Sequence, residues 1–238
     1  MCNPFFVLVR VDWWIVPMKF EKIPSIAVTR LAVYARKLEH LDQKGEEVVS
    51  SVRLADICRI NPAQVRKDLA YFGQFGIRGL GYYVKGLLLE ISKILGLDRE
   101  WHFGLVGVGN LGWALLKHAQ SVKKGYSFVA AFDKRPNRIG LKVGDIRVEP
   151  LESMKCMVKE KGVEIGVIAV KPEWAQDAAD RLVSAGVRGI LNFAPVELNS
   201  PASVSIENVD FSLKLGVLCY RLTTAKSKRH HITSKLGA

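Results

Sequence analysis

The sequence has few cysteines, and no grouping of them suggests a disulfide framework or a metal site. Four cysteines are spread over 238 residues, with no C-x-x-C pair and no histidine cluster beside them. This spacing predicts neither disulfides nor a bound metal, and it agrees with a reducing, cytoplasmic location.

A long apolar run is also missing. Residues 5–16 are mostly apolar, but they contain Arg10 and Asp12 and are too short to span a bilayer. No small-residue cleavage site follows. A strand around Arg10 and Asp12 is one interpretation. We favour residues 1–20 as an extension without function, because Met18 is an equally good natural start, and we expect no membrane partner.

Acidic residues are too few to balance the basic ones. The chain has 35 Lys and Arg against 23 Asp and Glu, a net charge of +12. Residues 53–85 hold six basic and two acidic residues, and residues 221–238 hold five basic and none acidic. The excess favours a polyanionic partner, although a solvated basic surface would also explain it. The length favours two domains.

The clearest motif lies in residues 102–116, where an apolar strand runs through three glycines into a helix. Gly107, Gly109 and Gly112 fit G-x-G-x-x-G, which provides a tight turn, close approach to a pyrophosphate and close helix–strand packing. A second apolar run ends at Asp133, 21 residues after Gly112, where an acid accepts the ribose hydroxyls of the adenosine half. A glycine turn without a dinucleotide is the alternative. The predicted cofactor contacts here are Gly107, Val108, Gly109, Asn110, Leu111, Gly112 and Asp133.

The pattern after Asp133 completes an α/β domain. We expect a helix over residues 151–159, a buried strand over 163–170, a helix from Pro172 to Gly186 and a last strand over 187–193. Ligands lie outside the carboxyl ends of such strands. The residues expected to flank the nicotinamide are Val170, Lys171, Pro172, Asn192, Phe193 and Ala194. Lys171 has no histidine or carboxylate partner in the sequence, so no catalytic residue is predicted.

Three helices are predicted before this domain. The first begins at Pro24, with Leu31, Tyr34, Leu38 and Leu41 at helical spacing, and ends before Gly45. Ser50 or Ser51 caps the second. Asn61 caps the third, with Pro62 in its first turn, Gln64 completing a capping box and Gly73 as the stop. Two helices joined by so short a turn form a helix-turn-helix.

The third helix has a packing face and a polar face. Val65, Leu69 and Phe72 share the first, and the rest of the helix carries residue types that bind base edges and phosphates. Residues 76–84 form a glycine-rich strand–turn–strand, interpreted as a wing along the phosphate backbone, and a helix over 85–95 joins the domains. An ordinary solvated face is the alternative. The predicted DNA contacts are Asn61, Gln64, Arg66, Lys67, Tyr71 and Arg78.

Several segments together resemble one family. QVRKDLAYFG, FGIRGLGY, LVGVGNLG, GILNFAPV and ENVDF are similar to segments of the redox-sensing repressor family Rex, and the match runs from Ile23 to about Thr224. The resemblance implies a homodimer that represses genes of fermentation and anaerobic respiration. It binds operator DNA, an inverted repeat, when free or NAD-bound, and leaves when NADH binds.

The resemblance also assigns a switch. It implies that the closing helix is exchanged between subunits and that the counterparts of Asp210 and Phe211 reach the partner's nicotinamide pocket. It also implies that Arg36 pairs with Asp210 in the NADH-bound form. His118 stands where some relatives carry a tyrosine, which puts in question that tyrosine's role as an alternative partner of Asp210 and adds a titratable group to the switch. Lys134 and Arg135 stand where relatives often place another acid, which weakens the exclusion of NADP.

The predicted fold is therefore α/β, with a winged helix-turn-helix domain, a Rossmann domain for NAD and NADH, and a swapped C-terminal helix. The expected segments are the extension 1–20, the DNA-binding domain 21–98, the Rossmann domain 99–208, the swapped helix 209–224 and the basic tail 225–238. The competing functions are an NAD(P)-dependent dehydrogenase or other nucleotide-using enzyme, and a simple CoA- or nucleotide-binding module.

Overall fold

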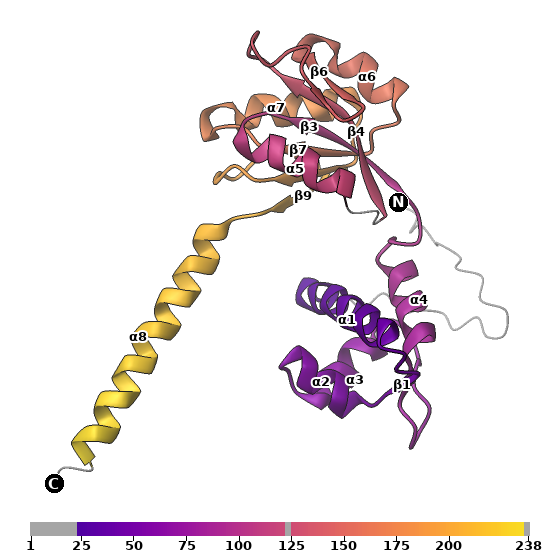
Figure 1. Cartoon of the computed structure of the whole chain (residues 1–238), viewed down its shortest axis with the longest axis vertical. Helices are drawn as coiled ribbons and strands as arrows, with labels where there is room; N and C mark the ends of the chain where they lie inside the picture. Colours follow the sequence, from indigo (N-terminus) through magenta and orange to yellow (C-terminus); the bar gives the residue numbers. More distant parts are fainter. Residues whose placement is uncertain (1–22, 122–124, 236–238) are drawn as a thin grey trace, which may run out of the picture. The chain divides into compact units, whose positions relative to one another are not determined.

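The structure is a computed structural model that describes residues 23–121 and 125–235. The chain divides into two compact units, residues 1–98 and residues 99–238 (Figure 1). The extension expected over residues 1–20 and the last three residues of the expected basic tail lie outside the described residues.

The described part of the first unit, residues 23–98, consists of four helices and a two-stranded sheet. Its elements are α1 (Ser25–Gln43), β1 (Val48–Val49), α2 (Ser51–Cys58), α3 (Pro62–Ala70), β2 (Tyr82–Tyr83) and α4 (Val84–Ile94). The three predicted helices are confirmed, and the helix expected over 85–95 begins one residue earlier.

Local capping explains the helix-turn-helix. The Ser50 hydroxyl accepts a hydrogen bond from the Arg53 N–H (3.0 Å), and the Asn61 side chain accepts one from the Ala63 N–H (2.7 Å). Between the two helices, Arg59 takes a left-handed conformation with φ 56°, which turns the chain sharply. The predicted capping box is not the arrangement formed, because the amide of Gln64 donates to Asp68 instead.

The wing differs from the predicted strand–turn–strand. Strand β2 pairs antiparallel with β1, a strand that the sequence did not reveal, and residues 76–81 contribute a single bridge between Ile77 and Gly81. A Cβ atom on Gly81 would lie 2.5 Å from the Val49 carbonyl oxygen, so a glycine is needed where the two segments meet.

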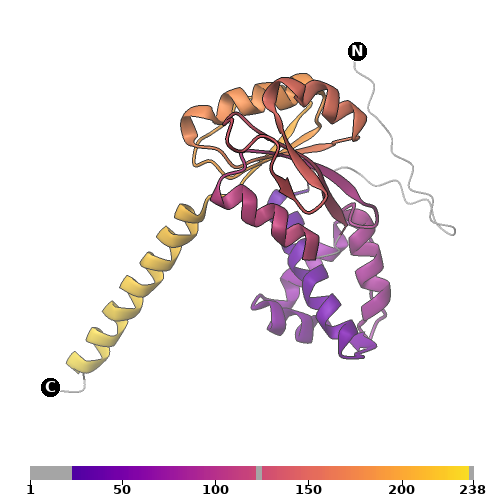
Figure 2. The same ribbon diagram turned by 45° about the horizontal axis from the view of Figure 1, so that its top comes forward.

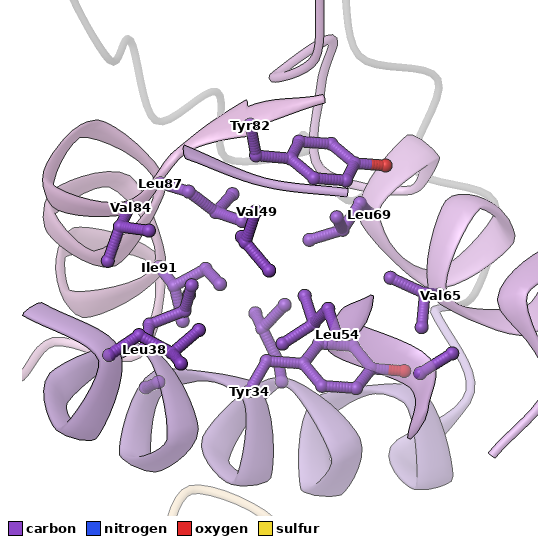
Figure 3. Packing of buried hydrophobic residues seen from close by; sticks show 14 residues of the cluster. Tyr34, Leu38, Val49, Leu54, Val65, Leu69, Tyr82, Val84, Leu87 and Ile91 are labelled. Atoms are coloured by element: carbon purple, nitrogen blue, oxygen red, sulfur yellow. The ribbon is translucent and has the colours of Figure 1, made fainter. Parts of the chain in front are cut away.

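The core of this unit is one apolar cluster that joins all four helices. Figure 3 shows it, with the Tyr34 ring beside Leu54 and the Tyr34 hydroxyl on the side of the core where Val65 lies. The buried members are Leu31, Tyr34, Ala35, Leu38, Leu41, Val49, Leu54, Ala55, Val65, Leu69, Tyr82, Val84, Leu87 and Ile91.

The second unit is an α/β domain followed by a helix. Its elements are β3 (Trp101–Val106), α5 (Asn110–Ser121), β4 (Tyr126–Asp133), β5 (Lys142–Val143), β6 (Ile146–Pro150), the 3-10 helix η1 (Leu151–Ser153), α6 (Met154–Glu160), β7 (Ile165–Ile168), α7 (Pro172–Ala185), β8 (Gly189–Asn192), β9 (Ser205–Asn208) and α8 (Phe211–Lys235).

The sheet has the strand order β5-β6-β4-β3-β7-β8-β9. All neighbours from β6 to β9 are parallel, and only β5 is antiparallel. The parallel strands follow the 3-2-1-4-5-6 order of a Rossmann fold. Three strands were not predicted: β5, β6 and β9, so the strand expected over 187–193 is not the last. The helix expected over 151–159 begins as the 3-10 turn η1.

The sheet is covered on both faces, which is why its central strands read as continuous apolar runs. Leu105 and Val167 pack on the α5 side with Leu116, while Val106 and Ile168 pack on the other side with Leu182 of α7. Figure 2 shows α5 and α7 on opposite sides of the sheet. The carboxyl ends of β3, β4, β7 and β8 therefore remain at one edge, where the loops carry the predicted site.

Candidate functional site

Two of the three motif glycines are required by the packing of the turn. Gly107 has φ +97°, and a Cβ there would lie 2.6 Å from both the Ala169 carbonyl oxygen and the Val170 side chain. A Cβ on Gly112 would overlap the Gly107 carbonyl oxygen. The turn after β3 and the end of β7 are thus in contact, which brings the glycine residues and Val170 together at the switch point of the sheet.

Gly109 has no such reason to be a glycine. Its φ is not positive, and the nearest protein atom to a Cβ there is the Arg135 Nη2 atom at 3.8 Å. Space therefore lies beside this backbone, at the start of α5, where the helix N-terminus favours an anion. This open position fits a dinucleotide pyrophosphate.

The carboxylate of Asp133 lies against the same turn. Its Oδ2 atom accepts hydrogen bonds from the Val108 N–H (2.8 Å) and the Arg135 Nη2 (2.8 Å). Its Oδ1 atom accepts from the backbone N–H (2.9 Å) and the Nε (3.0 Å) of Arg135. A carboxylate has about four lone-pair sites. The residue predicted to bind ribose hydroxyls is thus fully occupied by protein donors, two of them from the Arg135 side chain.

Burial and these donors act on Asp133 in opposite directions. Burial raises its pKa, but the side chain and backbone of Arg135 and the Val108 N–H together outweigh it and lower the pKa below the ordinary value. The carboxylate is therefore ionised at neutral pH.

The residues expected beside the nicotinamide lie on the next two strand ends. Val170 and Phe193 are half-buried and Pro172 is exposed at the start of α7. Asn192 is fully buried: its amide nitrogen donates to the carbonyls of Ala194 (3.0 Å) and Val196 (2.9 Å). Its side chain thus shapes the loop after β8, a role the sequence did not suggest, and its contact with a cofactor stays a prediction.

The polar face of α3 carries exposed cations. Arg66 and Lys67 are both exposed, and the Arg66 Nη1 donates to the Ser51 hydroxyl on α2 (3.0 Å). Tyr71 is half-buried just beyond the helix end. Arg78 is exposed in the turn between Ile77 and Gly81, where the Gly81 N–H bonds to the Ile77 carbonyl at 3.0 Å.

Asp68 is a residue of α3 whose role the sequence did not indicate. Its side chain has no exposed surface and accepts from the Arg30 Nε (2.6 Å) and Nη2 (2.7 Å), the Tyr34 hydroxyl (2.6 Å) and the Gln64 amide (2.6 Å). These donors outweigh the effect of burial and lower the pKa of Asp68. The i,i+4 spacing of Gln64 and Asp68 could have indicated their hydrogen bond. Nothing in the sequence indicates the bond from Arg30, which is 38 residues from Asp68.

The predicted switch residues are surface residues of this chain. Arg36 and His118 are exposed on α1 and α5. Asp210 precedes α8, and its Oδ1 accepts from the Ser212 N–H (2.7 Å), so it caps that helix. Phe211 is 77% exposed.

Neither a membrane span nor a metal cluster occurs in the described parts. Among the helices of residues 23–121 and 125–235, none is long and apolar enough to cross a membrane. Over those same residues, no three His, Cys, Asp or Glu side chains gather as they would around a metal ion.

Family models match both units. A putative DNA-binding protein N-terminus matches residues 22–70, and a CoA binding domain matches residues 98–196. The curated relatives of this chain include redox-sensing transcriptional repressors named Rex. The protein of Syntrophobacter fumaroxidans is 46% identical over 87% of this chain and 99% of its own. That of Desulforamulus reducens is 49% identical over 86% and 98%. The chain belongs to the Rex family.

Solved structures agree with this assignment to Rex. RSP, a Rex-family repressor, is 35% identical in its complex with β-NAD+ and operator DNA, with a TM-score of 0.80 over 87% of this chain and 96% of that one. In complex with β-NADH it is 33% identical, with a TM-score of 0.80 over 88% and 98%. Rex proteins are redox-sensing transcriptional repressors, so the comparisons support the predicted repressor and not the competing enzyme.

Proposed function

We propose that this protein is a cytoplasmic repressor that holds operator DNA when free or NAD-bound and releases it when NADH binds. One observation carries the proposal: the same chain holds an exposed basic helix in a helix-turn-helix and a glycine turn open at Gly109 beside a buried acid. The RSP structures, one with NAD+ and operator DNA and one with NADH, support this combination.

The Rossmann unit would hold the dinucleotide along one sheet edge. The backbone of residues 107–112 takes the pyrophosphate at the start of α5, Asp133 takes the adenosine ribose, and Val170, Pro172, Asn192 and Phe193 flank the nicotinamide. When bound, the cofactor supplies a ring that is positively charged in NAD and neutral in NADH. Phe211 would pack on that ring, and an apolar side chain favours the neutral form.

The winged helix would hold DNA through α3 and the turn at Arg78. Arg66 and Lys67 would contact guanine edges or phosphates, while Asn61, Tyr71 and Arg78 would bind the phosphate backbone of the DNA. Gln64 reaches a base only with the amide hydrogen and oxygen atoms that Asp68 leaves available, because one of its N–H groups is already used. The bound sequence is expected to be an inverted repeat, whose two-fold symmetry matches that of a dimer.

Helix α8 supports a homodimer. Phe211, Leu215, Leu218 and Leu222 recur at the spacing of one helix face, and Leu213, Val217 and Tyr220 lie on the opposite face; all seven are exposed. A helix that is apolar on two opposite faces needs cover on both. A partner subunit that receives α8 by helix exchange would provide that cover.

The switch is the pairing of Asp210 with Arg36 of the other subunit in the NADH-bound form, and His118 is a further residue of this switch. A ligand shifts such an equilibrium only by its differential affinity for the two states. The closed dimer would no longer hold its two α3 helices at the spacing of successive major grooves, about 34 Å or a multiple of it.

The proposal is tested by a mobility shift on an AT-centred inverted repeat. The complex should form without cofactor and with NAD, and it should dissociate as NADH is added. A scrambled duplex of equal length controls for binding through charge alone. Equal effects of NAD and NADH on the complex would disprove redox sensing, and no preference for the inverted repeat would disprove operator recognition.

A further inference from the structure

Asp133 cannot accept a ribose hydroxyl in the arrangement described. Four donors occupy its two oxygens, and two of these, the Nε and Nη2 of Arg135, belong to a side chain that can move. The other two are backbone N–H groups and stay in place. An adenosine ribose must therefore displace the Arg135 guanidinium to reach the carboxylate.

The displaced guanidinium would remain beside the ribose. Arg135 is two residues from Asp133, and its Nη2 already lies 3.8 Å from where a Cβ of Gly109 would be, next to the turn. Almost half of its side-chain surface is exposed, so water can hydrate the guanidinium when it leaves Asp133. A forked guanidinium is well suited to bind a phosphate with two parallel hydrogen bonds.

The charge around Asp133 also differs from that around an aspartate without a cationic partner. A lone aspartate repels a phosphate on the ribose 2′-oxygen, and that repulsion is the usual basis for excluding NADP. Here Arg135 neutralises Asp133, and Lys134 adds a cation whose Nζ lies 2.7 Å from the centre of the Trp174 ring. The two exposed side chains that directly follow Asp133 are therefore both cationic.

We propose that the adenosine end of this site accepts a 2′-phosphate, so that NADPH and NADP+ compete with NADH, with Arg135 as the residue that determines specificity. The inference rests on the proposed dinucleotide site. A ribose with free hydroxyls competes with Arg135 for Asp133, whereas a 2′-phosphate binds Arg135 itself. Removal of the Arg135 side chain therefore weakens the binding of NADPH but not the binding of NADH.

Calorimetric titration of the full chain and of Arg135→Gln with NADH and NADPH tests this directly. In the native protein the two dissociation constants should agree within about tenfold, the equivalent of one modest interaction. Arg135→Gln should bind NADPH about tenfold more weakly and NADH equally well or more tightly. A merely structural role of Arg135 would weaken both. Adenosine 2′,5′-bisphosphate and 5′-AMP, used as competitors, should show the same contrast without a nicotinamide.

Arg188→Gln is the matched control. Arg188 also donates to a carboxylate, that of Glu164, but it precedes β8 at the opposite edge of the sheet. The control should leave both affinities unchanged. Tight NADH binding without NADPH binding in the native protein would overturn the inference and leave the proposed function intact. No binding of either nucleotide would instead overturn the dinucleotide site itself.

Discussion

Each unit contains a buried carboxylate that is surrounded by hydrogen-bond donors. Asp68 and Asp133 each accept four hydrogen bonds, and in each case the side chain of an arginine provides two of them. Burial of a charge is costly unless it is paired and hydrogen-bonded. The two differ in what the arginine holds: Arg30 joins Asp68 to another helix, whereas Arg135 only closes a local site.

Asp68→Asn should destabilise the first unit and weaken DNA binding. The change removes the charge that Arg30 faces and leaves buried donors without an acceptor, at a cost of about 2 kcal/mol. Urea unfolding followed by circular dichroism measures the loss. Asp56→Asn, an exposed change on α2, is the control. An unchanged unfolding midpoint would show that the network does not hold α3.

Stability should also fall in acid because of this residue. The folded-state pKa of Asp68 is lowered, so its contribution is complete above the unfolded value of about 3.9 and is lost as the pH falls through the lower folded value. Native protein should lose stability over that range, and Asp68→Asn should lose less of it. Parallel losses in both proteins would assign the acid sensitivity to other carboxylates.

Asp133→Ala should weaken NAD and NADH alike, because the adenosine half is common to both. The expected result is a repressor that stays on DNA at NADH concentrations that release the native protein. Titration calorimetry and the mobility shift measure the two effects. Release at the native NADH concentration would remove Asp133 from the site.

At the scale of elements, α3 is held on one side and open on the other. Asp68 and Val65 fix it to the core, while Arg66 and Lys67 remain exposed. Helix α5 is similar, because packing requires Gly112 but leaves the backbone at Gly109 open. In each unit, the packing of one face of the helix determines which of its residues remain exposed to a ligand.

Arg66→Ala combined with Lys67→Ala should abolish operator binding and leave NADH affinity unchanged, because the two tasks belong to different units. Lys67→Ala alone should weaken binding to all sequences and reduce the salt slope of the binding constant by about one. Ser51→Ala, which removes the hydroxyl that Arg66 contacts, controls for a disturbed helix. Loss of NADH binding in the double variant would contradict this division of tasks.

At the scale of the whole molecule, we expect a partner subunit to cover the apolar faces of α8. Leu215→Glu with Leu218→Glu should convert a dimer into a monomer, since each change places a charge in a face expected to be buried. Light scattering after size-exclusion chromatography gives the mass. Lys214→Glu, a charge change at another exposed position of α8, should leave the dimer intact. A dimeric double variant would locate the interface elsewhere.

Asp210→Asn separates capping from charge. Asparagine caps a helix as well as aspartate does, so α8 should keep its start, while the proposed pair with Arg36 is lost. The variant should bind NADH normally but release DNA poorly, and Arg36→Ala should behave the same way. Release by either variant at the native NADH concentration would disprove the pair, although the repressor would remain a redox sensor.

The sequence by itself determined the features that depend on near neighbours along the chain. Ser50, Asn61 and Gly186 ended or began their helices where expected, because a cap bonds to backbone groups within four residues. The glycine motif could also be recognised from the sequence, because its spacing is set by the single turn between β3 and α5. Family membership followed from the same short segments, and the relatives confirmed it.

Only the tertiary structure decided which distant groups meet. Strands β1, β5, β6 and β9 are short, and their pairing depends on partners elsewhere in the sheet rather than on their own sequence. The bond from Arg30 to Asp68 spans 38 residues. For Arg135, only two residues from Asp133, the sequence indicates no more than a nearby cation, because its hydrogen bonds to Asp133 depend on a side-chain rotamer and on the buried Val108 N–H beside it. These partners are determined by burial and packing in the folded chain, and no local sequence pattern predicts them.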